Sequence, residues 1–137
     1  MTQPHSRLSR TLEQLEGQPV SQPARNDTPL AQKCLRLMHV PLNELTTENV
    51  RMLVLQQIGL KHLVPLAMDK LEANPFVAGD HYAGDLLHAV VEVPPDFWAS
   101  EPELRSRLDG LIRSLEDMVK FLERDVLPAY RRIYGAS

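Results

Sequence analysis

Apolar residues recur every three or four positions along most of this chain, which is the period of an amphipathic helix. The run LLHAVVEV (86–93) includes a stretch that also suits a strand, but no partner strand is visible, so we predict a helix there too. The pattern predicts an all-α, single-domain bundle of about five to six helices. The expected buried faces are Leu8, Leu12 and Leu15; Leu30, Cys34, Leu37 and Met38; Val50, Leu53, Val54 and Ile58; Val64, Ala67, Met68 and Leu71; Leu86, Leu87, Val90 and Val91; and a long stripe from Leu104 to Leu122.

One segment near the N-terminus differs in composition from the rest of the chain. Residues 18–27, QPVSQPARND, are polar and rich in proline, so they are typical of a linker. We expect residues 1–27 to form a short helix and a linker that attach loosely, and residues 28–137 to form the main domain. Thr28 followed by Pro29 predicts a helix N-terminus at the start of that domain.

Two further helix starts can be predicted from local signals. Pro65 has no amide donor, so its helix is expected to begin near residue 61, with Pro65 in the first turn. Ser100 and Glu103 are three residues apart and form the pattern of a capping box, which predicts the start of the last long helix.

The stripe in residues 104–122 is the longest apolar pattern in the chain. Its members are spaced 4-3-4-3-4, like a heptad repeat. Ile112, Val119 and Phe121 make the stripe wider than a coiled-coil seam, so we expect it to form the spine of the bundle. The alternative is a helical scaffold or adaptor that self-associates through residues 104–122.

Composition excludes several classes of protein. The chain has 137 residues, of which 43% are apolar and 24% charged, as in ordinary globular domains. We find no apolar run long enough for a spanning helix and no secretory signal pattern at the N-terminus. The single cysteine, Cys34, lies on an apolar face and is expected to be buried and unreactive. Together these features predict a cytoplasmic protein with no membrane partner.

Charge is distributed unevenly along the chain. Residues 62–103 contain one lysine and eight carboxylates, a net charge of −7, whereas residues 1–61 and 104–137 each carry +2. A concentrated negative segment disfavours nucleic acid as a partner, because phosphates need a basic footprint. It favours a basic partner.

No motif for catalysis stands out. Glycines are scattered, without a phosphate-binding loop, and no G-x-S-x-G pattern occurs. His81, Asp85 and His88 would share a face if a helix began at residue 81, which makes a zinc-dependent enzyme an alternative hypothesis. Gly79 and Gly84 argue for a later helix start, so we predict no enzymatic activity, no cofactor and no metal.

A set of short motifs lies between residues 45 and 98. They are QQIGL (56–60), LVPLA (63–67), Asn74–Pro75, GD-x-Y-x-GDLL (79–87) and Phe97–Trp98. The set covers about two-fifths of the chain and resembles the immunity proteins of bacterial contact-dependent growth inhibition (CDI) systems. The resemblance implies a cytoplasmic protein that binds and neutralises the C-terminal domain of a cognate toxin, so that the producing cell is protected.

The expected partner follows from the resemblance together with the charge. Many such toxin domains are basic nucleases, so we expect a one-to-one heterodimer with a basic toxin domain. The predicted toxin-facing residues are exposed carboxylates of the negative segment and one aromatic anchor: Glu72, Asp80, Tyr82, Asp85, Glu92 and Asp96. Two alternatives stay open. These acids can instead form a solvated face with turns and caps, and the 79–87 motif can be a signature of the fold, with the partner bound elsewhere.

Overall fold

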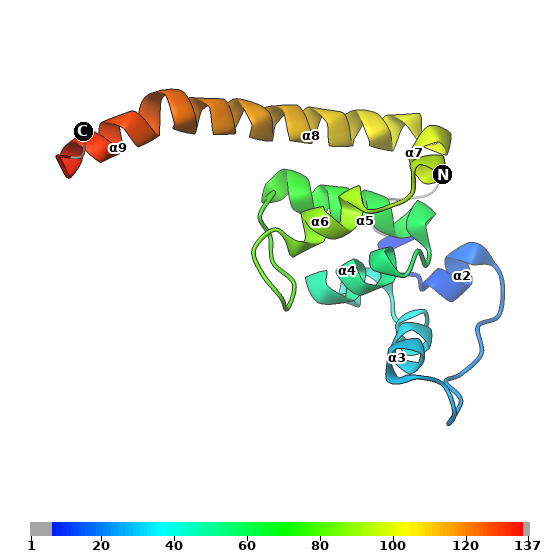
Figure 1. Ribbon diagram of the computed structural model, residues 1–137. Helices are drawn as coiled ribbons and strands as arrows, with labels where there is room; N and C mark the ends of the chain where they lie inside the picture. The colour runs from blue at the N-terminus through cyan, green and yellow to red at the C-terminus, as the bar shows by residue number, and fades with distance from the viewer. Residues whose placement is uncertain (1–6, 136–137) are drawn as a thin grey trace. The chain divides into compact units, whose positions relative to one another are not determined.

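The computed structural model describes residues 7–135 (Figure 1). Within this range the regular structure is helical, and the only β-type pairing is an isolated bridge between Ala78 and Ala83. The predicted all-α fold is therefore confirmed. No helix in the described range combines the length and apolar character needed to span a bilayer. The chain divides into two compact units, Met1–Ser100 and Glu101–Ser137.

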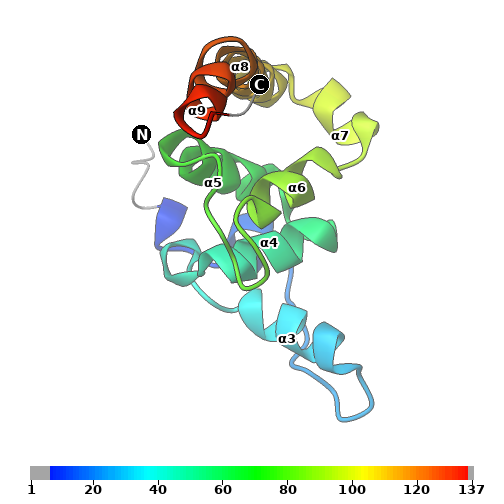
Figure 2. The same ribbon diagram turned by 60° about the vertical axis from the view of Figure 1, so that its left-hand side comes forward.

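The first unit is a succession of short helices in which α4, α5 and α6 pack against one another (Figure 2). The run LLHAVVEV contributes to α6, so the choice of helix over strand is correct. Thr28 caps α3 as predicted, its hydroxyl accepting from the amide of Ala31 at 3.1 Å. The elements are α2 (Leu12–Glu16), α3 (Pro29–Leu37), the 3-10 turn η1 (Leu42–Glu44), α4 (Thr47–Leu55), α5 (Leu60–Ala73), α6 (Asp85–Val91) and α7 (Pro95–Ser100).

The core of this unit comes from the faces that the apolar pattern predicted. Leu30 and Val91 are exceptions, with exposed fractions of 43% and 47%, and the partly buried members are Leu8, Leu15, Met38, Ile58 and Leu87. Cys34 is buried as expected. Trp98 is also buried, and its indole N–H donates to the carbonyl of Val93 at 3.2 Å. Side chains that are fully or almost fully buried in α4, α5 and α6 are Val50, Leu53, Val54, Leu63, Val64, Ala67, Met68, Leu71, Leu86 and Val90.

Helix α2 belongs to this core. Leu12 is fully buried, and it contacts Gly59 so closely that a Cβ at residue 59 would lie 2.7 Å from Leu12 Cδ2. The amide of Glu13 donates to the carbonyl of Met38 at 3.2 Å. The loose attachment expected for residues 1–27 therefore does not describe α2, while residues 1–6 lie outside the described residues.

The expected position of Pro65 in a first helical turn is wrong. Helix α5 begins at Leu60, which places Pro65 in the helix interior. A proline there leaves the carbonyl of Lys61 without its helical N–H donor. The guanidinium of Arg7 approaches that carbonyl to 3.5 Å, so a donor from the N-terminal segment compensates in part for the missing amide.

The predicted capping box at Ser100 and Glu103 is also wrong. Helix α8 (Pro102–Phe121) has Glu101 as its N-cap residue and no side-chain cap. Ser100 still belongs to α7, where its hydroxyl donates to the carbonyl of Phe97 at 2.8 Å. Because the fixed φ of proline suits the first helical position, Pro102 sets the start of α8 one residue later than the box pattern would.

The second unit is one helical run. Helix α8 passes into a π-helical turn, η2 (Leu122–Val126), and then into α9 (Leu127–Ile133) (Figure 1). The π-turn lets the chain continue helically through Pro128, since the amide of Leu127 bonds five residues back to Leu122. Of the predicted stripe Leu104 is buried, but Met118 and Leu122 are 57% and 44% exposed. The C-terminal half of the stripe therefore carries exposed apolar side chains.

Candidate functional site

The 74–84 loop joins α5 to α6 and carries most of the GD-x-Y-x-GDLL motif. It begins with a local turn in which Oδ1 of Asn74 accepts from the amide of Phe76 at 3.0 Å. It closes on itself where the amide of Gly84 donates to the carbonyl of Phe76 at 3.1 Å. Gly84 has φ +91°, a left-handed conformation that favours glycine. The loop is thus a compact turn of defined geometry.

Four consecutive amides of this loop donate to two carboxylates beneath it. The amide of Asp80 donates to Oε1 of Glu48 at 2.9 Å. The other three reach Asp85: Gly79 donates to Oδ1 at 2.6 Å, and His81 and Tyr82 donate to Oδ2 at 3.1 and 3.3 Å. The loop backbone is therefore anchored on one carboxylate from α4 and one from the start of α6.

Arg51 connects the two carboxylates. Its Nε and one terminal nitrogen each donate to Glu48 at 2.7 Å, in a bidentate pair. The same Nε lies 3.9 Å from Oδ2 of Asp85. Glu48 and Asp85 are only 7% and 2% exposed. Buried carboxylates need partners of this kind, because an unpaired buried charge is costly.

The pKa values of these groups are shifted toward their charged forms. The hydrogen bond from Arg51 is the main reason that the pKa of Glu48 falls to about 2; burial opposes the shift, and the Asp80 amide supports it. Burial raises the pKa of Asp85, but the three loop amides and Arg51 outweigh it, so that pKa is lowered. The hydrogen bond to Glu48 raises the pKa of Arg51. At neutral pH the cluster therefore holds two negative charges and one positive charge.

The close packing of the loop against the two carboxylates explains why residue 79 is a glycine. A Cβ on residue 79 would lie 2.5 Å from Oε1 of Glu48 and 3.2 Å from Oδ2 of Asp85. Only glycine lets the backbone approach both carboxylates at once. Gly79, Gly84 and Asp85 are thus parts of the anchor, whereas the side chains of Asp80, His81 and Tyr82 are exposed.

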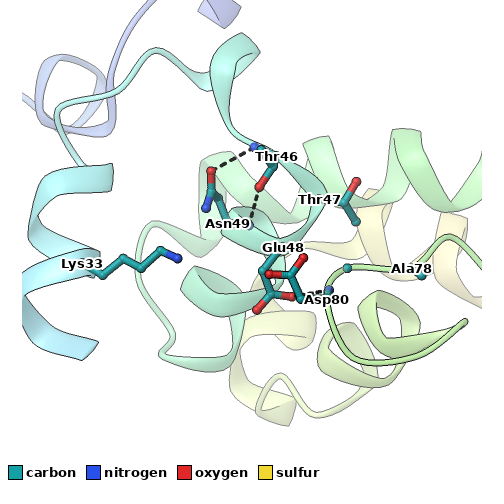
Figure 3. Close-up of a pocket in the computed structure, with 8 residues that line it drawn as sticks. Lys33, Thr46, Thr47, Glu48, Asn49, Ala78 and Asp80 are labelled. Carbon is teal, nitrogen blue, oxygen red and sulfur yellow. Dashed lines mark hydrogen bonds between the residues drawn. The ribbon is translucent and has the colours of Figure 1, made fainter. Parts of the chain in front are cut away.

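One hollow of about 400 Å³ lies on the side of the loop that faces α3 and the N-terminus of α4 (Figure 3). The ammonium group of Lys33 points into it from α3. Thr46 and Asn49 form a reciprocal capping box with bonds of 3.0 and 3.1 Å, so their polar atoms are engaged in starting α4. The lining residues are Lys33, Thr46, Thr47, Glu48, Asn49, Ala78, Gly79 and Asp80.

A second hollow of about 400 Å³ lies between the loop, the end of α4 and α6. On its wall the hydroxyl of Tyr82 lies 2.6 Å from Nδ1 of His88, and Nε2 of His88 lies 3.4 Å from Oε1 of Glu92. These three side chains form a chain of polar contacts. The lining residues are Arg51, Leu55, Tyr82, Asp85, His88, Ala89 and Glu92.

The structure brings part of the predicted site together. Tyr82, Asp85 and Glu92 line the second hollow, and Asp80 lines the first. Glu72 in α5 and Asp96 in α7 line neither of these two hollows, although Glu72, Asp80, Glu92 and Asp96 are all exposed as predicted.

Asp85 requires a correction. We expected an outward-facing carboxylate, but its side chain is only 1% exposed. The three loop amides and Arg51 hold it inside the molecule, so it supports the surface and does not form part of it.

The structure lacks the helix turn that the zinc hypothesis for His81, Asp85 and His88 required. It required a helix from residue 81, but α6 begins at Asp85. Both carboxylate oxygens of Asp85 accept loop amides. Within residues 7–135 no group of three histidine, cysteine or acidic side chains is arranged to hold a metal ion.

Sequence reasoning missed Glu48 and Arg51. Glu48 was visible only as an acid in the first turn of a helix, where it complements the helix dipole. The spacing of three residues between Glu48 and Arg51 is a signal for a helical ion pair, but such pairs are usually exposed. Nothing local indicated that the 74–84 loop would fold over the pair.

A comparison with known protein families gives a match over most of the first unit. A family model for CDI immunity proteins matches residues 14–108, more than half of the chain, and includes the end of α2, all of α3 to α7 and the whole 74–84 loop. The chain belongs to this family. Searches of curated proteins and of solved structures found no match.

Proposed function

We propose that this protein neutralises the C-terminal domain of its cognate CDI toxin by binding it, without catalysis, through a surface built around the 74–84 loop. The observation that carries the proposal is the anchoring of this loop on Glu48 and Asp85. Its backbone is held by buried groups while the side chains of Asp80 and Tyr82 stay exposed. A surface that is ordered before binding loses less conformational entropy when a partner docks.

Charge supports a basic toxin domain as the partner. The segment 62–103 keeps its strong excess of carboxylates after Asp85 is assigned to the interior, and Glu72, Asp80, Glu92 and Asp96 are exposed. Complementary charge speeds association and disfavours wrong partners. A basic nuclease domain, bound one to one in the cytoplasm of the producing cell, fits this surface.

The test is to produce the protein together with the toxin C-terminal domain encoded beside it. We expect a one-to-one complex by size-exclusion chromatography with light scattering, and growth of cells that carry both proteins. Asp80→Lys is expected to slow association about tenfold at low salt, and less at high salt. Glu44→Lys, the same charge change at an exposed site on η1, is the matched control. Absence of a complex for the unaltered protein would refute the proposal.

A second candidate function has one observation in its favour. In the second unit Met118, Phe121 and Leu122 are 57%, 51% and 44% exposed, and large apolar side chains gathered on one helix often mark an interaction surface. A scaffold that self-associates through residues 104–122 would bury them. Light scattering over a range of protein concentrations distinguishes the two, since a monomer at all concentrations excludes the scaffold.

A further inference from the structure

We propose that the second hollow, lined by Arg51, Leu55, Tyr82, Asp85, His88, Ala89 and Glu92, accepts a single lysine or arginine side chain of the toxin domain. This inference rests on the proposed function, and it names one contact through which the immunity protein would hold the toxin domain. It depends on the size of the hollow, its charge and the position of one aromatic ring.

The hollow is large enough to admit one long side chain. Its volume of about 400 Å³ is near the lower end of the range for small-ligand pockets, about 300–1,000 Å³. Three separate parts of the first unit form its walls: the last turns of α4, the 74–84 loop and α6. Leu55 and Ala89 supply apolar surface, which suits the aliphatic stem of lysine or arginine.

The charge of the hollow favours a cation. Glu92 supplies an exposed carboxylate, and the buried Asp85 adds its negative charge from inside the molecule, against the single guanidinium of Arg51. That guanidinium is already bound in a bidentate pair to Glu48, whose carboxylate remains ionised because its pKa is about 2. The carboxylate of Glu92 at the exposed rim therefore has the imidazole of His88, at 3.4 Å, as its neighbour and is not paired with that guanidinium.

The ring of Tyr82 completes the site. It is 53% exposed, and its hydroxyl lies 2.6 Å from Nδ1 of His88. This contact links Tyr82 to His88 while the ring remains accessible. An aromatic face next to a carboxylate is a favourable setting for lysine or arginine, because a cation–π interaction adds to the ionic attraction. Tyrosine and arginine are also frequent in the few contacts that dominate interface energies.

The inference is tested by dissociation rates of the complex with the neighbouring toxin domain, measured by surface plasmon resonance. We expect Glu92→Gln and Tyr82→Leu each to speed dissociation about tenfold, because they remove the carboxylate and the aromatic face. Tyr82→Phe keeps the ring and is expected to change the rate less than about threefold. Glu44→Gln is the matched control for the loss of an exposed carboxylate. Glu92 pairs with His88 at an exposed position, so Glu92→Gln is expected to leave the fold intact.

Replacing the lysines and arginines of the toxin domain one at a time identifies the bound side chain. We expect one replacement to weaken binding to the unaltered immunity protein and to have little further effect on Glu92→Gln, as in a double-mutant cycle. If the complex forms and both Glu92→Gln and Tyr82→Leu dissociate like the unaltered protein, the inference is refuted while the proposed function stands. If the unaltered protein forms no complex, both are refuted.

Discussion

Gly79 and Glu48 approach so closely that a Cβ on residue 79 would lie 2.5 Å from Oε1 of Glu48 and 3.3 Å from its Cα. The glutamate cannot easily move away, because Arg51 and the amide of Asp80 hold its carboxylate. The absence of a side chain at residue 79 is thus a condition for anchoring the loop.

Gly79→Ala is therefore expected to destabilise the protein by about 1–3 kcal/mol, the usual cost of forcing an extra methyl group into a packed site. Urea denaturation measures the change. Gly110→Ala is the control, because a Cβ there meets nothing within 4 Å and alanine favours a helix. A Gly79→Ala variant as stable as the original would show that the loop can relax away from Glu48.

Acid is expected to weaken the fold through Glu48 and Asp85. The pKa of Glu48 is about 2 in the native state, below its ordinary value of 4.5, so folding favours the ionised form. Its contribution is complete above the unfolded pKa and is lost as the pH falls from about 4.5 toward 2, up to about 3 kcal/mol in total. The pKa of Asp85 is lowered too, so its contribution has the same sign.

The free energy of unfolding, measured between pH 7 and pH 2, checks this prediction. Glu48→Gln should lose stability at neutral pH, because Arg51 is left without its closest anion, and should show a flatter dependence on acid. If the free energy of unfolding of the two proteins fell in parallel between pH 5 and pH 2, the loss of stability in acid would not come from Glu48.

Helix α2 should matter for the stability of the first unit. Leu12 is fully buried against Gly59, so Leu12→Ala is expected to cost about 2–5 kcal/mol, as large-to-small changes in cores do. Leu15→Ala, on the same helix at a partly exposed position, is the comparison. Equal stability of the two variants would mean that α2 is not held in the core.

Cys34 should react slowly in the folded protein. Burial raises the pKa of its thiol, although nearby Lys33 opposes the shift, so little thiolate forms at neutral pH. A coloured disulfide reagent should label it slowly without denaturant and rapidly in urea. Fast labelling of the folded protein would contradict its buried position.

The helices of the first unit could be predicted because apolar periodicity and local caps act over a few residues. Thr28 and Pro29 start α3 as their types suggest, and the predicted faces of α4, α5 and α6 form the core. Where two local signals compete, the sequence alone did not decide correctly. Pro102 set the start of α8 in place of Ser100, and Pro65 was accommodated inside α5.

The candidate site could be predicted only in part. Tyr82 and Glu92 were identified from charge and residue type, and both line the second hollow. The burial of Asp85 was not predictable, because it depends on amides of the loop and on Arg51, which is 34 positions away in the sequence. A carboxylate has the same appearance in a sequence whether water or backbone amides surround it.

The anchoring of the 74–84 loop has an evolutionary consequence. Positions 80, 81 and 82 contribute to it through their amides, which every residue except proline possesses. Selection can therefore exchange these side chains without dismantling the turn that displays them. The same arrangement offers protein engineers a small set of variable positions on a constant support, from which new binding preferences can be selected.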